Sequence, residues 1–260
     1  MAQLIKLNDY ISRYETDLSR YTSLFVRLKK RRWDSMLEYE IKNQSAPNEV
    51  EDLKRTFLDQ LFISQIKWAS STITEKSYPH SSLYSDVRLR KLLQRFPDTF
   101  LLMYNPIFQL KKAKVQLEVI MVTPSKVICM SFLDDEDNAF FIGSQEHFWQ
   151  KKTQNGENKV LNPIISVRRM DKVIKQIFQT NDTELPIEKV IIAENGYITH
   201  QNPPDDVRFI DKQNYETWLT ELKSYNTPLK MMQFRAARAL LEKSVRTSVR
   251  RSYGVGGSHD

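Results

Sequence analysis

The centre of the chain reads QLEVIMVTPSKVICMSF over residues 116–132. Two runs of apolar and β-branched residues, 116–122 and 127–130, flank the short segment Thr123-Pro124-Ser125. Apolar runs of this length, bounded by Pro and Ser, are typical of buried strands separated by a turn. We therefore predict a pair of strands here, hinged at 123–125.

The segments around this pair alternate between strand and helix patterns. Leucines recur every three to four residues over 86–96, and apolar residues do so over 164–179 and 215–222, which indicates amphipathic helices. Shorter β-rich runs indicate strands. The sequence thus predicts an α/β fold with a central mixed β-sheet flanked by helices. The expected strands are 100–104, 113–122, 126–133, 139–143, 189–193, 197–198 and 208–210.

Residues 1 to about 76 have the pattern of helices. Aromatic and aliphatic residues recur at helical spacing from Leu18 to Tyr39 and again from Leu53 to Trp68. The polar segment 43–47 ends in a proline and predicts the turn, and Asn48 with Glu51 resembles a capping box for the second helix. We predict an N-terminal helical hairpin within residues 1–83, followed by an α/β domain over 84–222.

The C-terminal segment, 223–260, is basic. From Lys223 onward there are eight Lys or Arg residues and two acids, so this segment carries +6 of the formal net charge of +7. Met231 to Val249 has apolar residues at helical spacing with arginines on its flanks. The glycines from Gly254 onward indicate a flexible C-terminal end. We predict a basic amphipathic C-terminal helix with a flexible tail.

Composition excludes several classes of protein. The chain has 260 residues, of which 40% are hydrophobic and 27% are charged, which excludes wholesale disorder. The lone Cys129 cannot form an internal disulfide, and no Cys/His group has zinc-ligand spacing. No apolar segment is long enough to cross a bilayer, and no leader pattern is visible. We therefore expect a cytoplasmic protein.

The middle of the chain resembles the nuclease-related domain (NERD) family of the PD-(D/E)XK nuclease superfamily. The resemblance covers residues 84–222. It is carried by a helix ending in Phe96-Pro97 before a strand, by the hinged strand pair 116–130, and by Trp149. It continues with Val160-Leu161-Asn162-Pro163 at the start of a helix and with Val190-Ile191-Ile192. The resemblance implies a restriction-endonuclease-like fold.

The resemblance also implies metal-dependent phosphodiester cleavage, and the chain lacks part of the residues for it. In the superfamily an Asp on one strand and a Glu on the next hold a divalent ion, and a Lys two residues after that Glu assists. Here Glu118 takes the place of the Asp, and Met130-Ser131-Phe132 takes the place of Glu-x-Lys. Asp86 corresponds to an early helical acid. We predict a catalytically degenerate nuclease fold, with Glu118 as the metal ligand if there is one.

A working nuclease with a migrated site is the alternative. Asp134, Asp135 and Glu136 follow the second strand of the central pair, and Lys126 precedes it. Such an enzyme would need Mg²⁺ or Mn²⁺, whereas the degenerate protein needs no cofactor. A strand of four residues spans about 13 Å, so Asp134 lies too far from Met130 to replace a carboxylate there without a bulge.

Basic residues are the candidates for partner binding. Nucleic acid or an acidic protein is the expected partner, because clustered cations neutralise phosphates or carboxylates. The same clusters also fit solvated helix surfaces, and the last helix could simply pack on the hairpin. A scaffold that forms homo-oligomers through its N-terminal helices is a third interpretation. The candidate residues are Lys29, Lys30, Arg31, Arg32, Arg168, Arg169, Arg235, Arg238, Arg246, Arg250 and Arg251.

Overall fold

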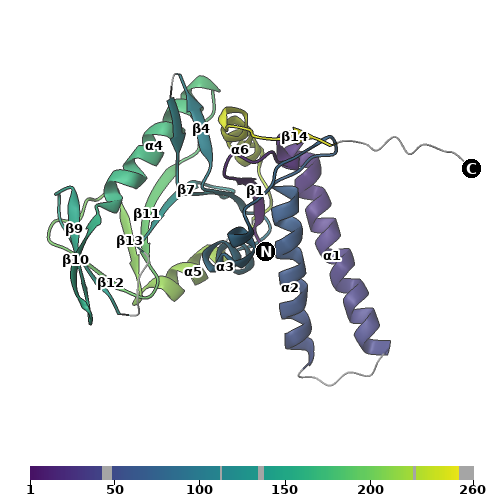
Figure 1. The fold of residues 1–260 in the computed structure, drawn as a ribbon, viewed down its shortest axis with the longest axis horizontal. Helices are drawn as coiled ribbons and strands as arrows, with labels where there is room; N and C mark the ends of the chain where they lie inside the picture. The colour runs from purple at the N-terminus through teal and green to yellow at the C-terminus, as the bar shows by residue number, and fades with distance from the viewer. Residues whose placement is uncertain (43–48, 112, 134–137, 225–226, 252–260) are drawn as a thin grey trace, which may run out of the picture.

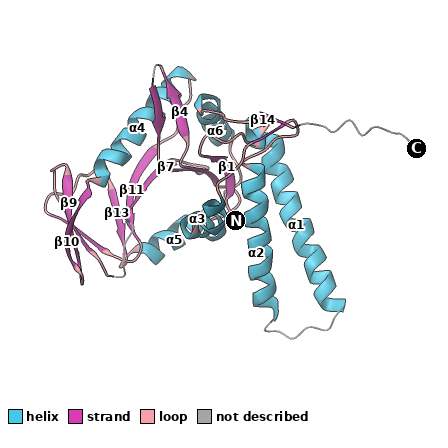
Figure 2. Cartoon of the chain, in the orientation of Figure 1, coloured by secondary structure: helices cyan, strands magenta, loops and turns pink. Residues whose placement is uncertain are grey.

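A central six-stranded sheet with helices on both faces forms the body of the molecule (Figures 1 and 2). The computed structural model describes residues 1–42, 49–111, 113–133, 138–224 and 227–251. The sheet order is β1-β3-β6-β7-β11-β13. This confirms a mixed α/β protein. The six strands are β1 (Gln3–Leu7), β3 (Leu101–Tyr104), β6 (Val119–Val122), β7 (Val127–Phe132), β11 (Ile187–Ala193) and β13 (Arg208–Asp211).

The predicted strand pair lies in the middle of this sheet as β6 and β7. The two strands are antiparallel, with Val119 opposite Met130 and Val122 opposite Val127. β6 is also antiparallel to β3, whereas the β1–β3, β7–β11 and β11–β13 pairs are parallel. The carboxyl ends of the other five strands therefore lie at the same edge of the sheet, next to the start of β6.

Alternate side chains of these strands enter two separate cores. Met121 and Met130 belong to the core beneath one pair of helices, α3 (Val87–Arg95) and α5 (Tyr215–Ser224). Ile120 and Cys129 belong to the core on the opposite face, beneath α4 (Pro163–Thr180) and α6 (Met231–Lys243). Because strand side chains alternate between faces, helices on both sides explain why β6 is apolar at every position and β7 at every position but Ser131.

A second, four-stranded sheet packs beside the body in the order β10-β9-β8-β12. Its inward residues, among them Phe141 and Trp149, form a third core with Ile191 and Val207. The β9–β10 hairpin was not among the predicted strands, because its exposed residues make the segment read as polar. The strands are β8 (Phe140–Gly143), β9 (Phe148–Thr153), β10 (Gly156–Leu161) and β12 (Tyr197–His200).

Short elements complete the chain. The predicted strand 113–122 is interrupted at Leu117-Glu118. Its first half therefore lies in a separate two-stranded sheet and not in the main sheet. Among the described residues, no helix combines the length and the apolar character needed to cross a bilayer. These elements are β2 (Glu75–Lys76), β4 (Ile107–Leu110), β5 (Ala113–Gln116), β14 (Val249–Arg250) and the 3-10 helices η1 (Arg13–Glu15) and η2 (Ser81–Ser85).

The prediction of helix from residue 1 is wrong for the first residues. Gln3–Leu7 form the edge strand β1, which pairs with β3 and places part of the predicted 1–83 segment inside the main sheet. The two predicted N-terminal helices are confirmed: α1 (Leu18–Lys42) and α2 (Glu49–Trp68) extend together away from the body (Figure 1). The predicted turn at 43–47 and the cap at Asn48 lie outside the described residues.

The C-terminal helix is shorter than predicted. α6 ends at Lys243, and Ser244 already has extended backbone. The chain then returns to the N-terminal part of the molecule, where Val245 N–H donates to Ile107 (2.7 Å) and Thr247 N–H donates to Asp9 (2.7 Å). β14 pairs with β2. Arg246, Arg250 and Arg251 therefore do not lie on a basic helix, and the glycines from Gly254 lie outside the described residues.

A buried lysine connects these two ends. Lys6 on β1 is 0% exposed, and its ammonium donates to Glu15, to the Tyr10 carbonyl (2.8 Å) and to the Val245 carbonyl (2.9 Å). Arg246 Nε lies 2.9 Å from the other Glu15 oxygen. Burial lowers the pKa of Lys6, and the nearby Glu15 carboxylate opposes that shift. All three ammonium protons thus have acceptors.

Replacing this lysine should destabilise the fold. In Lys6→Met the Glu15 carboxylate stays buried without its main partner, so we expect urea denaturation to give a free energy of unfolding lower by about 3–5 kcal/mol. The double variant Lys6→Met/Glu15→Leu removes both charges and should lose clearly less than the single variant. Equal midpoints for Lys6→Met and the native chain would contradict this role.

Candidate functional site

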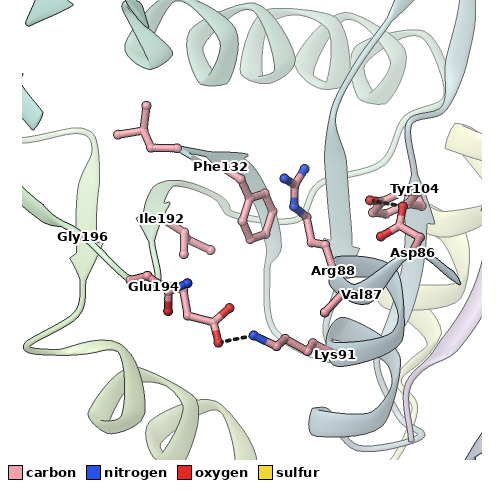
Figure 3. Close-up of a pocket in the computed structure, with 11 residues that line it drawn as sticks. Asp86, Val87, Arg88, Lys91, Tyr104, Phe132, Ile192, Glu194 and Gly196 are labelled. Carbon is pink, nitrogen blue, oxygen red and sulfur yellow. Dashed lines mark hydrogen bonds and ion pairs between the residues drawn. The ribbon is translucent and has the colours of Figure 1, made fainter. Parts of the chain in front are cut away.

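The most informative cavity lies at the edge of the main sheet where strands β3, β7 and β11 end. It has a volume of about 390 Å³, and its lining includes Tyr104, Phe132 and Glu194 from these strand ends (Figure 3). The first turn of α3 closes its other side. In open α/β sheets ligands bind outside the carboxyl ends of the strands. We call this cavity the sheet-edge pocket.

Both carboxylate oxygens of Asp86 accept hydrogen bonds that hold α3 against the end of β3. One carboxylate oxygen caps α3 by accepting from Leu89 N–H (2.9 Å), and the other accepts from the Tyr104 hydroxyl (2.8 Å). Burial, and next the Asp86 charge, raise the pKa of Tyr104, so the phenol remains a proton donor at neutral pH. The predicted remnant acid therefore acts here as a helix cap that fastens α3 to β3.

Arg88 and Phe132 form the centre of the pocket. The Arg88 guanidinium lies 4.8 Å from the centroid of the Phe132 ring, and the two side chains lie side by side in Figure 3. Such a cation–π contact helps to hold the guanidinium in place. Phe132 occupies the position that the resemblance assigns to the superfamily's lysine. Met130, at the position of the glutamate, is buried in the core.

A second cation, Lys91, reaches across the pocket to an acid on its other side. Lys91 on α3 donates to the Glu194 carboxylate (2.8 Å), which follows β11, and the dashed line in Figure 3 marks this ion pair. Arg95, one turn later, lies 3.8 Å from the same carboxylate and 3.3 Å from Glu216. Val87, in the first turn of α3, is 63% exposed and lines the pocket.

Glu118 is directed toward the opposite face of the sheet. Its carboxylate accepts from the Ser131 hydroxyl (2.9 Å), from Phe132 N–H (3.3 Å) and from the hydroxyl of Ser166 on α4. Asp86 belongs to the α3 side, so the two predicted remnant acids do not meet. Side-chain alternation along β6 accounts for this direction, because Glu118 lies two residues before Ile120, which enters the core beneath α4.

The donors around Glu118 do not fit a magnesium site. Mg²⁺ takes carboxylates and waters, whereas here one carboxylate is already saturated by two hydroxyls and an amide. Across the described part of the chain, no three His, Cys, Asp or Glu side chains are grouped so that they could hold a metal ion. Asp134, Asp135 and Glu136, the acids of the migrated-site alternative, lie outside the described residues.

The basic residues predicted from the helices are dispersed over the surface. On α1, Lys29 is ion-paired with Asp98 and Arg32 donates to Ser64 (2.7 Å), whereas Lys30 and Arg31 are exposed. On α4, Arg168 pairs with Asp206 (3.0 Å) and Arg169 is exposed. The Arg168 hydrogen bond lowers the pKa of Asp206.

The C-terminal arginines do not form one continuous patch either. Arg235 and Arg238 on α6 line a shallow hollow of about 420 Å³ together with Asp182 and Glu242. Arg246 is paired with Glu15, as described above. Arg250 lies in β14, and the Arg251 amide donates to the Thr74 carbonyl (2.8 Å). The described basic residues of this segment are thus divided between α6 and the return path that follows it.

Sequence reasoning missed Arg88, Lys91 and Glu194. The helix 86–96 was predicted with its leucines inward, so Arg88 and Lys91 were expected on its polar face. Their spacing of three residues places them on neighbouring positions of one face. The sequence carries no signal that Phe132 and Glu194 would come to the same place, since that follows from strand order.

Comparisons with known proteins add little to this geometry. No family model matches the chain, and no solved structure matches it. A stretch of 34 residues is 59% identical to part of an RNA 2',3'-cyclic phosphodiesterase from Geobacillus stearothermophilus. The match covers 13% of this chain and 11% of that protein, which is too little to assign a family or an activity.

The capping role of Asp86 gives a test by stability. Asp86→Ala removes the cap of α3 and leaves the Tyr104 hydroxyl without its acceptor, so we expect thermal or urea denaturation to show a loss of about 2 kcal/mol. Asp86→Asn keeps one oxygen for the cap and should lose less than half of that. An unchanged stability in Asp86→Ala would contradict the structural role.

Proposed function

We propose that this chain is a nuclease-fold protein, related to the NERD family, that binds nucleic acid and no longer cleaves it. The observation that carries the proposal is the Arg88–Phe132 pair. A fixed cation lies at the carboxyl edge of the sheet, beside Phe132, the position where the resemblance implies a lysine. An acidic protein is the other partner that such cations would suit.

The order of elements supports the fold part of the proposal. Helix α3, strands β3, β6 and β7, helix α4 and strand β11 occur in this order along the chain, with β4 and β5 inserted before β6 and β8, β9 and β10 inserted before α4. Apart from the inserted strands, this is the order of helices and strands that the sequence predicts for the main sheet. β1 and β13 extend the sheet at its two edges.

The chemistry of the sheet-edge pocket suits a phosphate. The first turn of α3 presents the positive end of the helix dipole, and anions are stabilised there. A guanidinium can donate two parallel hydrogen bonds to phosphate oxygens. Arg88 is the side chain we assign to the phosphate.

Equilibrium binding tests this proposal directly. Fluorescence anisotropy with labelled duplexes and single strands of about 20 nucleotides, DNA and RNA, should give log K that falls linearly with log salt between roughly 50 and 200 mM. Arg88→Gln should weaken binding by roughly tenfold, because a charged hydrogen bond is worth about 1.5–3 kcal/mol. Lys172→Gln, an exposed cation on α4, is the matched control.

The same samples separate the alternatives. The native chain with Mg²⁺ or Mn²⁺ should leave every substrate intact; cleavage that chelation and Glu118→Gln both abolish would establish the migrated-site nuclease instead. Absence of detectable binding to all four nucleic acids at low salt would rule out the nucleic-acid proposal.

A further inference from the structure

One face of the four-stranded sheet β10-β9-β8-β12 is open to solvent. Strand side chains alternate, so the neighbours of the buried residues Phe141 and Trp149 point away from the core. Phe140 is 50% exposed and Phe148 is 49% exposed. We call the face that carries these two phenylalanines the outer face.

Aromatic side chains lie at two separate sites on the outer face. Phe140 stacks on Tyr197 of the neighbouring strand β12, with ring centroids 5.0 Å apart and planes 22° apart. Phe148 lies on β9 beside His147, whose ring meets it edge-on at 4.9 Å. Phe140 is opposite Lys152, four residues from Phe148, so the two sites are about 13 Å apart along the strand.

Two lysine side chains lie near these rings on the same face. The register places Lys152 opposite both Phe140 and Glu157, and it places Lys159 opposite Gln150 on the same face. Lys152 pairs with Glu157 at 2.7 Å, but both side chains are well exposed, and such a pair is worth little in water. An incoming phosphate can therefore compete for Lys152.

We infer that the outer face binds single-stranded nucleic acid, with bases stacked on Phe140 and Phe148 and phosphates paired with Lys152 and Lys159. This inference rests on the proposed function and specifies its ligand. Open four-stranded sheets with exposed aromatics and neighbouring cations bind single strands in this way, because every unpaired base offers a π-face. A duplex hides those faces within its stack.

The outer face is connected to the sheet-edge pocket. Gly196 lines that pocket, and the next residue is Tyr197, the partner of Phe140. Gly196 lies against the carbonyl of Ala139, so close that a Cβ there would come within 2.7 Å of that oxygen. The first residues of β8 and β12 are thus held at the rim. The outer face thus begins one residue from the lining of the sheet-edge pocket.

Binding of the full chain to oligo(dT) and oligo(U) of about 12 nucleotides tests the inference. Phe140→Ala and Phe148→Ala should each weaken binding about 5- to 50-fold, since stacking of one base contributes about 1–3 kcal/mol. Affinity for a duplex of the same length should change less than twofold. Tyr78→Ala, an aromatic 68% exposed beside β2, is the matched control and should bind like the native chain.

Conservative variants distinguish a loss of base stacking from a loss of folding. Phe140→Tyr and Phe148→Tyr keep a ring and should restore binding to within about threefold. Circular dichroism should show equal folding for the alanine and tyrosine variants. If an alanine variant is folded and binds single strands as tightly as the native chain, the inference is wrong.

The outcomes also separate this inference from the proposed function. Loss of binding in Arg88→Gln but not in the phenylalanine variants would leave the proposed function intact and overturn the outer face as its site. No binding by the native chain would remove both. A dimer in light scattering that the phenylalanine variants dissociate, with binding unchanged, would assign the face to a second copy of the chain.

Discussion

The structure depends on the burial of β6 between two antiparallel neighbours. All four of its residues are buried, and both edges of the strand are paired. A strand that is covered on both faces must be apolar throughout, and Val119–Val122 meets that demand. Because β6 alone opposes the direction of the other five strands, their carboxyl ends gather at one edge. The sheet-edge pocket exists as a consequence of that reversal.

Much of the fold could be predicted from the sequence wherever the apolar residues follow a clear helix or strand pattern. The central strands and the helices α3, α4 and α5 have clear apolar periods, and they lie where they were expected. β1 was missed because its lysine looked like a helix surface residue, although Lys6 is buried by Glu15 and two carbonyls. The end of α6 was missed because no glycine or proline marks Lys243, and the apolar spacing continues to Val249.

The site could be predicted only in part, and the reason is geometric. A resemblance pointed to Asp86 and Glu118, but only their hydrogen bonds, to α3 for Asp86 and to Ser166 on α4 for Glu118, show that they face opposite sides of the sheet. Arg88, Phe132 and Glu194 are far apart in the sequence. Strand order alone brings them together, and no local pattern encodes it.

The return of the chain after α6 has a consequence for how the protein is made. Lys6 finds its last acceptor on Val245, 239 residues later. During synthesis the first strand is therefore complete in its polar contacts only after Val245 has left the ribosome. Contacts of such sequence separation slow folding, so until then the Lys6 ammonium can use only its near neighbours Tyr10 and Glu15 and water as acceptors.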